Sequence, residues 1–269
     1  MARIIVLASN KGGVGRTTSA VNIAAGLARG LGGSPQRVLL VDTDPQANAT
    51  AVYLGPSAAL GPAAKTTIYE VLIQDVPAQE AILTVELELN YKARIPAGKL
   101  DLLPSHIRLA KAEIELQAMF QRESRLRVAL DPLQDQYDLI LIDTSPSLGL
   151  LTINGLVAAD ELIIPVEPGY FPLIGIGLLM ETVQNISKMN GIQLLGVLPT
   201  MQDRTVESRE TMEALKLKFQ EKLFRPIPRR IAARYAHANQ TDIFGLVDKL
   251  EDAIASSYAE VVKEIMARG

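Results

Sequence analysis

Short runs rich in Ile, Val and Leu recur along the chain, and each is apolar on both faces that a strand presents. Strands buried on both faces are typical of parallel sheets, because the crossover connections cover both sides with helices. The strands predicted in this way cover residues 3–9, 37–42, 99–104, 137–143, 161–166 and 193–199. Helical periodicity predicts helices between them, over 16–31, 106–121, 149–158, 173–189, 205–222 and 251–267. This alternation predicts an α/β fold with a mostly parallel, twisted sheet flanked by helices on both faces.

Two segments do not fit this alternation. Residues 54–67, LGPSAALGPAAKTT, have the composition of a loop, and residues 87–103 are compatible with a hairpin. Neither segment is long or polar enough to separate two domains, and the chain contains no internal repeat or low-complexity tail. We therefore expect a single domain over 1–269.

The composition excludes several kinds of chemistry. The 269 residues are 48% hydrophobic and include no Cys, so disulfides, thiolate-bound zinc, iron–sulfur clusters and cysteine nucleophiles are excluded. The two histidines, His106 and His237, are not paired in any recognisable motif. A histidine metal site or a Ser-His-Asp triad is therefore not expected.

Hydropathy and charge indicate a soluble, cytoplasmic protein without a membrane partner. The N-terminus shows no signal-peptide pattern, and no apolar run approaches the roughly 18 residues that span a bilayer. The last segment, SSYAEVVKEIMARG, has the pattern of a packed terminal helix and lacks a basic membrane-binding face. The net charge of −3 argues against a uniformly basic nucleic-acid-binding protein but is compatible with a local basic patch.

The first predicted strand runs into a glycine-rich turn, NKGGVGRTT, which is followed by a predicted helix. This is the context of a phosphate-binding loop, in which backbone N–H groups and the positive end of a helix dipole surround an anion. The strict P-loop pattern fails at two positions, since Asn10 replaces its first glycine and Arg16 its lysine. Thr17 is placed to bind Mg²⁺. The predicted loop residues are Lys11, Gly12, Gly13, Val14, Gly15, Arg16, Thr17 and Thr18.

Three aspartates follow apolar strands. Asp42 and Asp44 come at the end of the second predicted strand, and Asp143 ends a later one. Ligands of parallel α/β sheets bind at this edge, and a carboxylate there suits the support of a nucleotide-bound Mg²⁺. Helix capping is the alternative role of such residues, but it does not account for all three together with the loop.

Four stretches carry a family resemblance: NKGGVGRTTSAVNIA, VLLVDTDPQANAT, YDLILIDTSPSLGLLTINGL and GVLPTMQDRT. They resemble the ParA/Soj-type partition ATPases, whose Walker A motif is deviant, within the ParA–MinD superfamily of P-loop NTPase-like proteins. The resemblance covers most of the chain and is weaker after about residue 230. It implies ATP or ADP with Mg²⁺ as ligands and a homodimer that encloses the nucleotides.

The same resemblance assigns roles to the loop and to the acidic residues. Lys11 would reach the phosphates of the partner protomer, Thr17 would bind Mg²⁺, and Thr18 a phosphate. Asp44 would orient the attacking water. The magnesium would be supported by Asp42 and Asp143.

Resemblance also indicates contacts outside the loop. Pro228 and Arg229, in the IPR element, would lie beside the adenine base. Arg204 matches a family position for DNA binding, whereas a second such position falls on Ala232, where Arg230 or Arg234 would have to substitute.

Arg16 is the departure with the clearest chemical consequence. Arginine keeps the positive charge of the usual lysine, but its planar fork is bulkier than a compact ammonium group. Phosphoryl transfer depends on charge placed around a loose transition state, so a displaced cation affects rate more than binding. We therefore expect ATP binding to be retained and hydrolysis to be slow.

Residues 204–234 carry nine Lys and Arg against four Glu. Such a stripe holds DNA phosphates without reading sequence, although Glu213 with Lys216 and Glu221 with Arg225 are spaced to pair on a solvated helix.

Three hypotheses about the function stay open. The first is an ATP-switched dimer that partitions a DNA or organelle cargo on the nucleoid with a ParB-like partner. The second is a MinD-like membrane-associated positioning ATPase, and the third a nucleotide-binding scaffold that does not hydrolyse.

Overall fold

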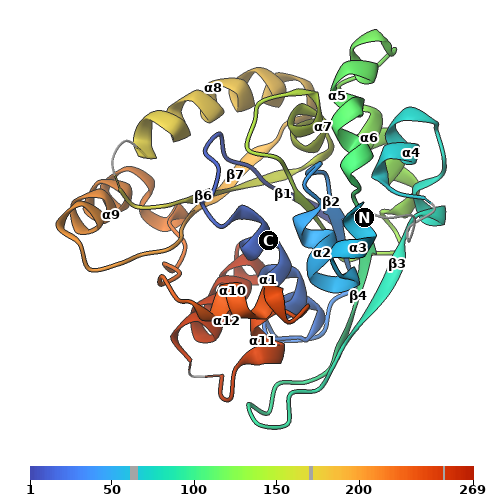
Figure 1. The fold of residues 1–269 in the computed structure, drawn as a ribbon. Helices are drawn as coiled ribbons and strands as arrows, with labels where there is room; N and C mark the ends of the chain where they lie inside the picture. Colours follow the sequence, from blue (N-terminus) through green and yellow to red (C-terminus); the bar gives the residue numbers. More distant parts are fainter. Residues whose placement is uncertain (61–65, 170–171, 251) are drawn as a thin grey trace.

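The computed structural model describes residues 1–60, 66–169, 172–250 and 252–269. Within these residues lies a seven-stranded sheet in the order β3-β4-β2-β5-β1-β6-β7 (Figure 1). Neighbouring strands run parallel except β3, which is antiparallel to β4. The strands are β1 (Arg3–Leu7), β2 (Val38–Asp42), β3 (Leu83–Leu87), β4 (Gly98–Leu103), β5 (Leu139–Asp143), β6 (Glu161–Val166) and β7 (Gln193–Pro199). This is the α/β fold with a mostly parallel sheet that the alternation predicts.

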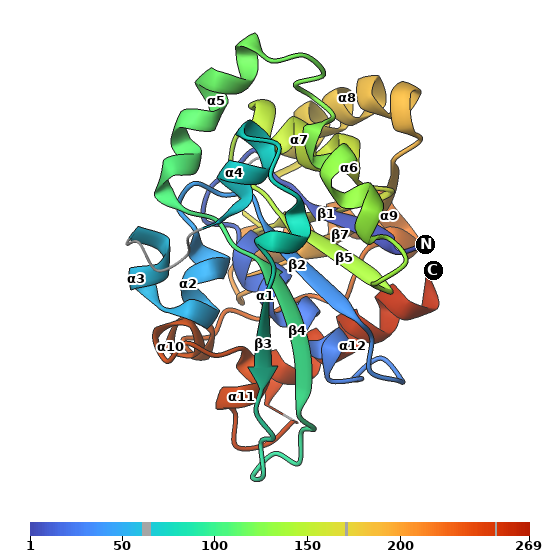
Figure 2. The ribbon, with the colours of Figure 1, turned by 90° about the vertical axis from the view of Figure 1, so that its right-hand side faces the viewer.

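All six predicted strands are present, and β3 is the strand that the pattern missed. It pairs with β4 as a hairpin that begins four residues before the predicted one, and Figure 2 shows this hairpin reaching toward α11. Because β3 is the edge of the sheet, its side chains are mostly exposed and do not form a run that is apolar on both faces. Its polar side chains pair across the hairpin, Thr84 with Asp101 and Glu86 with Lys99.

Helices cover both faces of the sheet, each over its own apolar cluster (Figure 1). One cluster includes side chains of α4 (Ile68–Ile73), α6 (Arg125–Leu130), α7 (Leu150–Ala158), α8 (Pro172–Asn190) and α9 (Val206–Phe219). The opposite cluster includes side chains of α1 (Arg16–Ala28), α2 (Asn48–Leu54), α10 (Ala232–Ala238), α11 (Ile243–Leu246) and α12 (Ala253–Ala267). The sheet is therefore buried on both sides, as its composition predicts.

Several helices differ from their predicted bounds. The helix expected over 106–121 is broken into 3₁₀ turns around the short α5 (Ala112–Glu115), and α9 ends at Phe219, before Gln220 at φ 45°. Within the loop expected over 54–67, α3 (Pro56–Leu60) forms, and residues 61–65 lie outside the described residues. The 3₁₀ helices are Ala78–Glu80, Ile107–Lys111, Leu116–Ala118, Asp131–Leu133 and Gln220–Lys222.

The short helices α2, α4, α6, α10 and α11 were not predicted. Isolated helices of this length are unstable in water, so tertiary packing and capping decide whether they form. At α4, for example, Thr67 and Glu70 form a reciprocal capping box. Such helices are too short to show a clear period in the sequence.

At the carboxyl end of the sheet, β1 stops pairing with β6 three residues before β6 ends. Their pairing ends at Leu7 and Ile163, whereas β6 continues along β7 through Pro165 to Val166. A proline has no N–H to donate to a further β1 residue. The chain after β1 is therefore free to form a loop at this edge. In the part of the chain that the structure describes, no helix is long and apolar enough to cross a membrane.

Candidate functional site

The glycine-rich segment forms a loop between β1 and α1. Gly13 and Gly15 both have φ 74°, a left-handed conformation that glycine adopts without strain. Gly15 caps α1 without a side-chain hydrogen bond, so the first N–H groups of the helix remain free for an acceptor in the cavity beside them. A hydrogen bond fixes the loop to the segment after β7, because the Thr200 hydroxyl donates to the Val14 carbonyl oxygen at 2.7 Å.

Beside this loop lies a cavity of about 440 Å³. Its walls come from the loop, from the segment after β2 and from the segment after β5. Seven predicted site residues, from two separate parts of the sequence, therefore meet at this cavity, whereas Lys11, Asp42 and Asp143 do not line it. The predicted residues that line it are Gly13, Val14, Gly15, Arg16, Thr17, Thr18 and Asp44. Gly12 lies next to it, against Pro146.

Arg16 is buried, with 6% of its surface exposed. Its Nε donates to the Thr144 carbonyl oxygen at 2.6 Å, and its Nη1 to that of Ser9 at 3.2 Å. Nε also lies 4.0 Å from Oδ1 of Asp143. Burial lowers the pKa of the guanidinium, and the neighbouring carboxylates oppose that change. The side chain thus contributes to the cavity wall while its donors bind the backbone at the ends of β1 and β5.

Asp42 and Asp143 are direct neighbours across β2 and β5, and both are fully buried. Oδ2 of Asp42 accepts from the Thr50 N–H at 2.8 Å and from the Thr50 hydroxyl at 2.7 Å. Oδ1 of Asp42 accepts from the N–H of Asp44 at 3.1 Å. Burial is the main cause that raises the pKa of Asp42 to about 6. This carboxylate is held rigidly by the start of α2.

Asp143 differs because neither of its carboxylate oxygens has a hydrogen-bond partner in the described part of the chain. Burial, and then the charge of Asp42, raise its pKa well above the usual range, while the charge of Arg16 lowers it. A buried carboxylate without donors is costly unless a ligand supplies them. A hydrated cation beside Thr17 would supply such donors, so these residues fit a supporting role for Mg²⁺.

The described residues contain no cluster of three His, Asp or Glu side chains that could hold a metal by themselves. Mg²⁺ in nucleotide sites keeps several waters and takes its remaining ligands from phosphates and from one or two side chains. The donor set here therefore matches an ion that arrives with a nucleotide.

Asp44 is held at the cavity wall by its own turn. Its Oδ1 accepts from the N–H of Gln46 at 2.9 Å, and its carbonyl oxygen accepts from the Ser105 hydroxyl at 2.7 Å. It is 4% exposed and faces the phosphate-loop cavity. A carboxylate in this position can accept a proton from, or orient, a water bound in the cavity.

The unpartnered oxygens of Asp143 lead to a stability prediction. We expect Asp143→Asn to stabilise the nucleotide-free protein by about 0.5–2 kcal/mol at neutral pH, because a neutral amide avoids the cost of a buried charge. Since folding raises the pKa of Asp143, its ionisation destabilises the parent, and the gain should grow as the pH rises above about 4. Urea denaturation of both proteins at pH 5 and 7.5 measures this difference. A variant less stable than the parent at pH 7.5 would contradict it.

A second cavity, of about 520 Å³, adjoins the first and shares Gly15, Thr18, Met201 and His237 with it. Pro228 and Arg229 line this second cavity, so the structure places the IPR element beside the phosphate loop. Its remaining walls are mostly apolar and come from the segment after β7 and from α10 and α12. Its position and lining suit a flat organic group attached to a phosphate chain.

His237 is a site residue that the sequence motifs do not reveal. It lines both cavities, its Nε2 is buried without a hydrogen-bond partner in the described part of the chain, and burial lowers its pKa. A single histidine in a short helix carries no motif, so no signal in the sequence indicates this position. Only the packing of α10 against the phosphate loop places it here.

Basic residues predicted to bind DNA are exposed. Arg204 lies in the turn before α9, and Arg230 follows the IPR element. Arg234 is in α10, and its side chain lies outside the described residues. Of the described ion pairs, none joins Glu213 to Lys216 or Glu221 to Arg225, whereas Arg229 pairs with Glu167 and lies near Asp203. The exposed basic residues of this stripe are Arg204, Arg209, Lys216, Lys218, Lys222, Arg225, Arg229 and Arg230.

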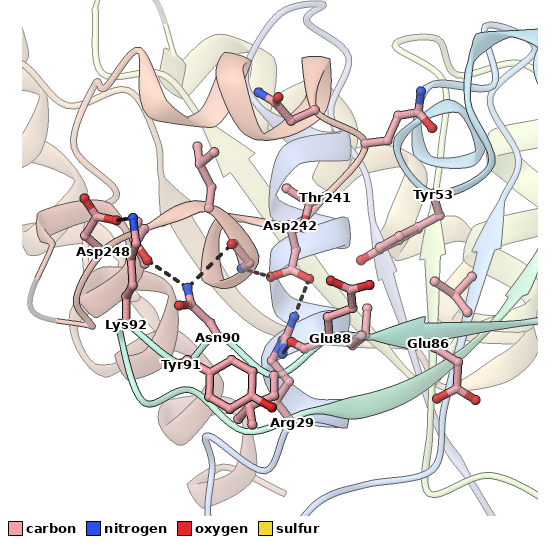
Figure 3. A pocket seen from close by; sticks show the side chains of 18 residues that line it. Arg29, Tyr53, Glu86, Glu88, Asn90, Tyr91, Lys92, Thr241, Asp242 and Asp248 are labelled. Atoms are coloured by element: carbon pink, nitrogen blue, oxygen red, sulfur yellow. Dashed lines mark hydrogen bonds and ion pairs between the residues drawn. The ribbon is translucent and has the colours of Figure 1, made fainter.

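A third cavity, of about 700 Å³, lies away from the phosphate loop, between the β3–β4 hairpin and the segment joining α10 to α11 (Figure 3). Arg29 and Asp242 form an ion pair of 3.1 Å in it, and each side chain is only 1% exposed. Arg29 also donates to the carbonyl oxygens of Glu88 and Pro96, and Asp242 caps α11. Lys92 and Asp248 pair at its exposed rim. The contacts made by the residues that line this cavity connect the β3–β4 hairpin with the C-terminal helices.

The order of strand, amide-lined loop and helix, with buried carboxylates on the two adjacent strands, defines a P-loop protein of the α/β class. The model of the AAA-domain family matches residues 2–194. Over its full length the chain is 39% identical to the sporulation initiation inhibitor protein Soj of Bacillus subtilis (strain 168), all of which is covered. It is 36% identical to the chromosome partitioning protein ParA of Myxococcus xanthus (strain DK1622), with 100% of this chain and 89% of that protein covered.

Among solved structures, cobyrinic acid a,c-diamide synthase from Mycobacterium smegmatis with bound ADP and magnesium superposes with a TM-score of 0.77. The two are 30% identical, over 97% of this chain and 93% of that one. The chain belongs to the AAA-domain family and, within it, to the ParA/Soj-type partition ATPases, which confirms the family predicted from its motifs.

Proposed function

We propose that the protein is a dimeric, ATP-driven switch that binds DNA without sequence preference in its ATP state. With a ParB-like activating adaptor, it would partition or position a DNA or organelle cargo on the nucleoid in the cytoplasm. The observation that carries this proposal is the pair of adjoining cavities at the phosphate loop, with the unpartnered Asp143 beside them. The similar synthase with bound ADP and magnesium supports the same ligands here.

In this proposal the triphosphate lies in the cavity at the loop and the base in the cavity lined by Pro228 and Arg229. The backbone N–H groups of residues 13–18 surround the phosphates, and the Thr18 hydroxyl binds one of them. Thr17 would hold Mg²⁺, supported by Asp42 and Asp143. The ion, when bound, neutralises charge on the phosphate oxygens.

Hydrolysis would follow from the position of Asp44. This carboxylate orients a water in line with the γ-phosphorus, the new oxygen–phosphorus bond forms, and the bond to the oxygen shared with the β-phosphate breaks. ADP and phosphate leave. Lys11, whose side chain is 62% exposed, would reach the phosphates of the partner protomer and so make the dimer depend on ATP.

DNA binding would rest on the exposed basic stripe around α9. Its charges attract phosphates and release counterions, which gives affinity without base readout. In a dimer the two stripes would contact the same duplex, so ATP-dependent dimerisation would switch DNA binding on.

We therefore expect binding of duplex DNA with ATP, much weaker binding with ADP, and no difference between DNA sequences. Affinity should fall steeply between about 50 and 200 mM salt. Arg204→Ala should weaken binding equally for all sequences, and it should lower the salt slope by about 1 if the arginine binds one phosphate. Fluorescence anisotropy at several salt concentrations measures both effects.

Arg37 provides the matched control for Arg204. It is an exposed arginine at the start of β2, at the opposite end of the sheet from Arg204, so Arg37→Ala should leave DNA binding unchanged. Equal binding of the ATP and ADP forms would contradict the switch. Stronger binding to anionic vesicles than to DNA would favour the MinD-like alternative.

One observation favours a second candidate function. The guanidinium of Arg16 is engaged by the backbone at Thr144 and Ser9. If that engagement persists with nucleotide bound, the protein would bind ATP without appreciable turnover and act as a nucleotide-dependent scaffold.

A further inference from the structure

One carboxylate lies between the two cations that flank the proposed nucleotide site. Oε2 of Glu167 is 3.4 Å from Nζ of Lys11, beside the phosphate loop. Oε1 of the same side chain accepts from Nη2 of Arg229 at 2.6 Å. Glu167 is 24% exposed, whereas the side chains of Lys11 and Arg229 are 62% and 53% exposed. The two cations therefore share a single, partly buried anion.

The position of Glu167 is fixed relative to the phosphate loop. It directly follows β6, and the preceding Val166 accepts from the N–H of Thr200 at 2.8 Å. The Thr200 hydroxyl lies 2.7 Å from the carbonyl oxygen of Val14 in the loop. Thr200 thus ties the end of β6, and with it the backbone that carries Glu167, to the loop.

Arg229 is fixed in a similar way on the other side. Its N–H donates to the carbonyl oxygen of Gln202 at 2.9 Å, so the segment that carries it is held beside the end of β7. Its side chain lines the second cavity, and its Nε is 3.9 Å from Oδ2 of Asp203. Glu167 therefore connects a cation of the glycine-rich loop with one that lines the second cavity.

On the basis of the nucleotide binding proposed above, we propose that Glu167 is a positioning residue that holds Lys11 and Arg229 in the nucleotide-free protein and is displaced from Lys11 by a polyphosphate. A phosphate chain needs cations, and a carboxylate that already neutralises them competes with it and repels it. The cost to binding rises with the charge of the phosphate chain. Glu167 thereby sets how strongly the site discriminates between nucleotides with one, two and three phosphates.

The test is the isosteric change Glu167→Gln, which keeps the size of the side chain and removes its charge. Calorimetry with Mg²⁺ measures the affinity for a non-hydrolysable ATP analogue, for ADP and for AMP. We expect the analogue to bind about fivefold more tightly to the variant, which is the scale of an exposed ion pair. ADP should gain less, and AMP should be unchanged.

Two controls separate this role from a general change in charge. Glu260→Gln removes a surface carboxylate that pairs with Lys263 at 2.9 Å on α12, and it should leave all three affinities unchanged. If Glu167 acts through Lys11, its change should bring a smaller gain in a Lys11→Gln background than in the parent. The thermal stability of each variant is measured in parallel, because a purely structural effect would not depend on the number of phosphates.

The outcomes are distinct. If the parent binds the analogue and Glu167→Gln binds it equally or more weakly, the positioning role is wrong while the nucleotide site stands. An equal gain for AMP and for the analogue, or the same gain in Glu260→Gln, would also overturn it. A parent that binds none of the three nucleotides would overturn the proposed nucleotide site and this inference with it.

Discussion

Replacing Arg16 with lysine is expected to raise ATP turnover by about two orders of magnitude, which corresponds to about 3 kcal/mol for one well-placed charged donor. In the structure the guanidinium donates to the carbonyl oxygens of Thr144 and Ser9, so its charge is directed at the strand ends. A compact ammonium group on a flexible stem can follow the phosphates instead. The affinity for ATP should change far less, because backbone N–H groups make most of the contacts with the phosphates.

Phosphate release and a separate ATP titration distinguish the two effects. Adding Asp44→Ala to the lysine variant should remove the gain in turnover while ATP stays bound, because the attacking water no longer has its orienting carboxylate. If parent and lysine variant hydrolyse ATP equally fast, arginine is a working substitute at this position. If both are inert with DNA and a partner present, the scaffold function takes precedence.

The change with the largest expected effect on stability is Asp242→Ala, which should lower the free energy of unfolding by about 3–5 kcal/mol. It leaves the guanidinium of Arg29 buried without its carboxylate, and it removes the cap of α11. Urea denaturation followed by circular dichroism measures this decrease.

Asp248→Ala is the matched control, because its partner Lys92 lies at the exposed rim of the same cavity, where the two side chains are 78% and 80% exposed. An exposed pair of this kind contributes about 0–1 kcal/mol. Similar decreases for Asp242→Ala and Asp248→Ala would show that the Arg29–Asp242 pair is not the element that holds the hairpin to α11.

Much of this fold could be predicted because most of its strands are buried on both faces. Five of them, β1, β2, β5, β6 and β7, therefore appear in the sequence as apolar runs, and β4 was predicted from a shorter run although its Lys99 is exposed. The edge strand β3 has an exposed face and carries no such run, and α4 or α11 form only where tertiary contacts and caps support them. A strand buried on both faces gives a strong hydrophobic pattern in the sequence, whereas a strand buried on one face or a short helix gives a weak one.

The phosphate loop and the aspartates at strand ends could be predicted for a similar reason, since local sequence determines both. The direction in which long side chains point, and the groups that they contact, could not be predicted. The direction of Arg16 depends on carbonyl groups at Ser9 and Thr144, and Glu167 reaches Lys11 over 156 positions of sequence. Such contacts result from the order of the strands, which places β6 beside β1.

The two borders of the sheet bear on how the protein behaves when many copies are concentrated in one place. Unpaired strand edges can recruit other chains and start aggregation. At β3, the strand at the open border, polar and charged side chains such as Thr84 and Glu86 disfavour intermolecular strand pairing. At β7, the chain's own segment around Leu223 and Pro228 bridges to Val197 and Gln202 and covers part of the border. We therefore expect the sheet not to grow between molecules, so that crowding on a shared surface does not lead to aggregation.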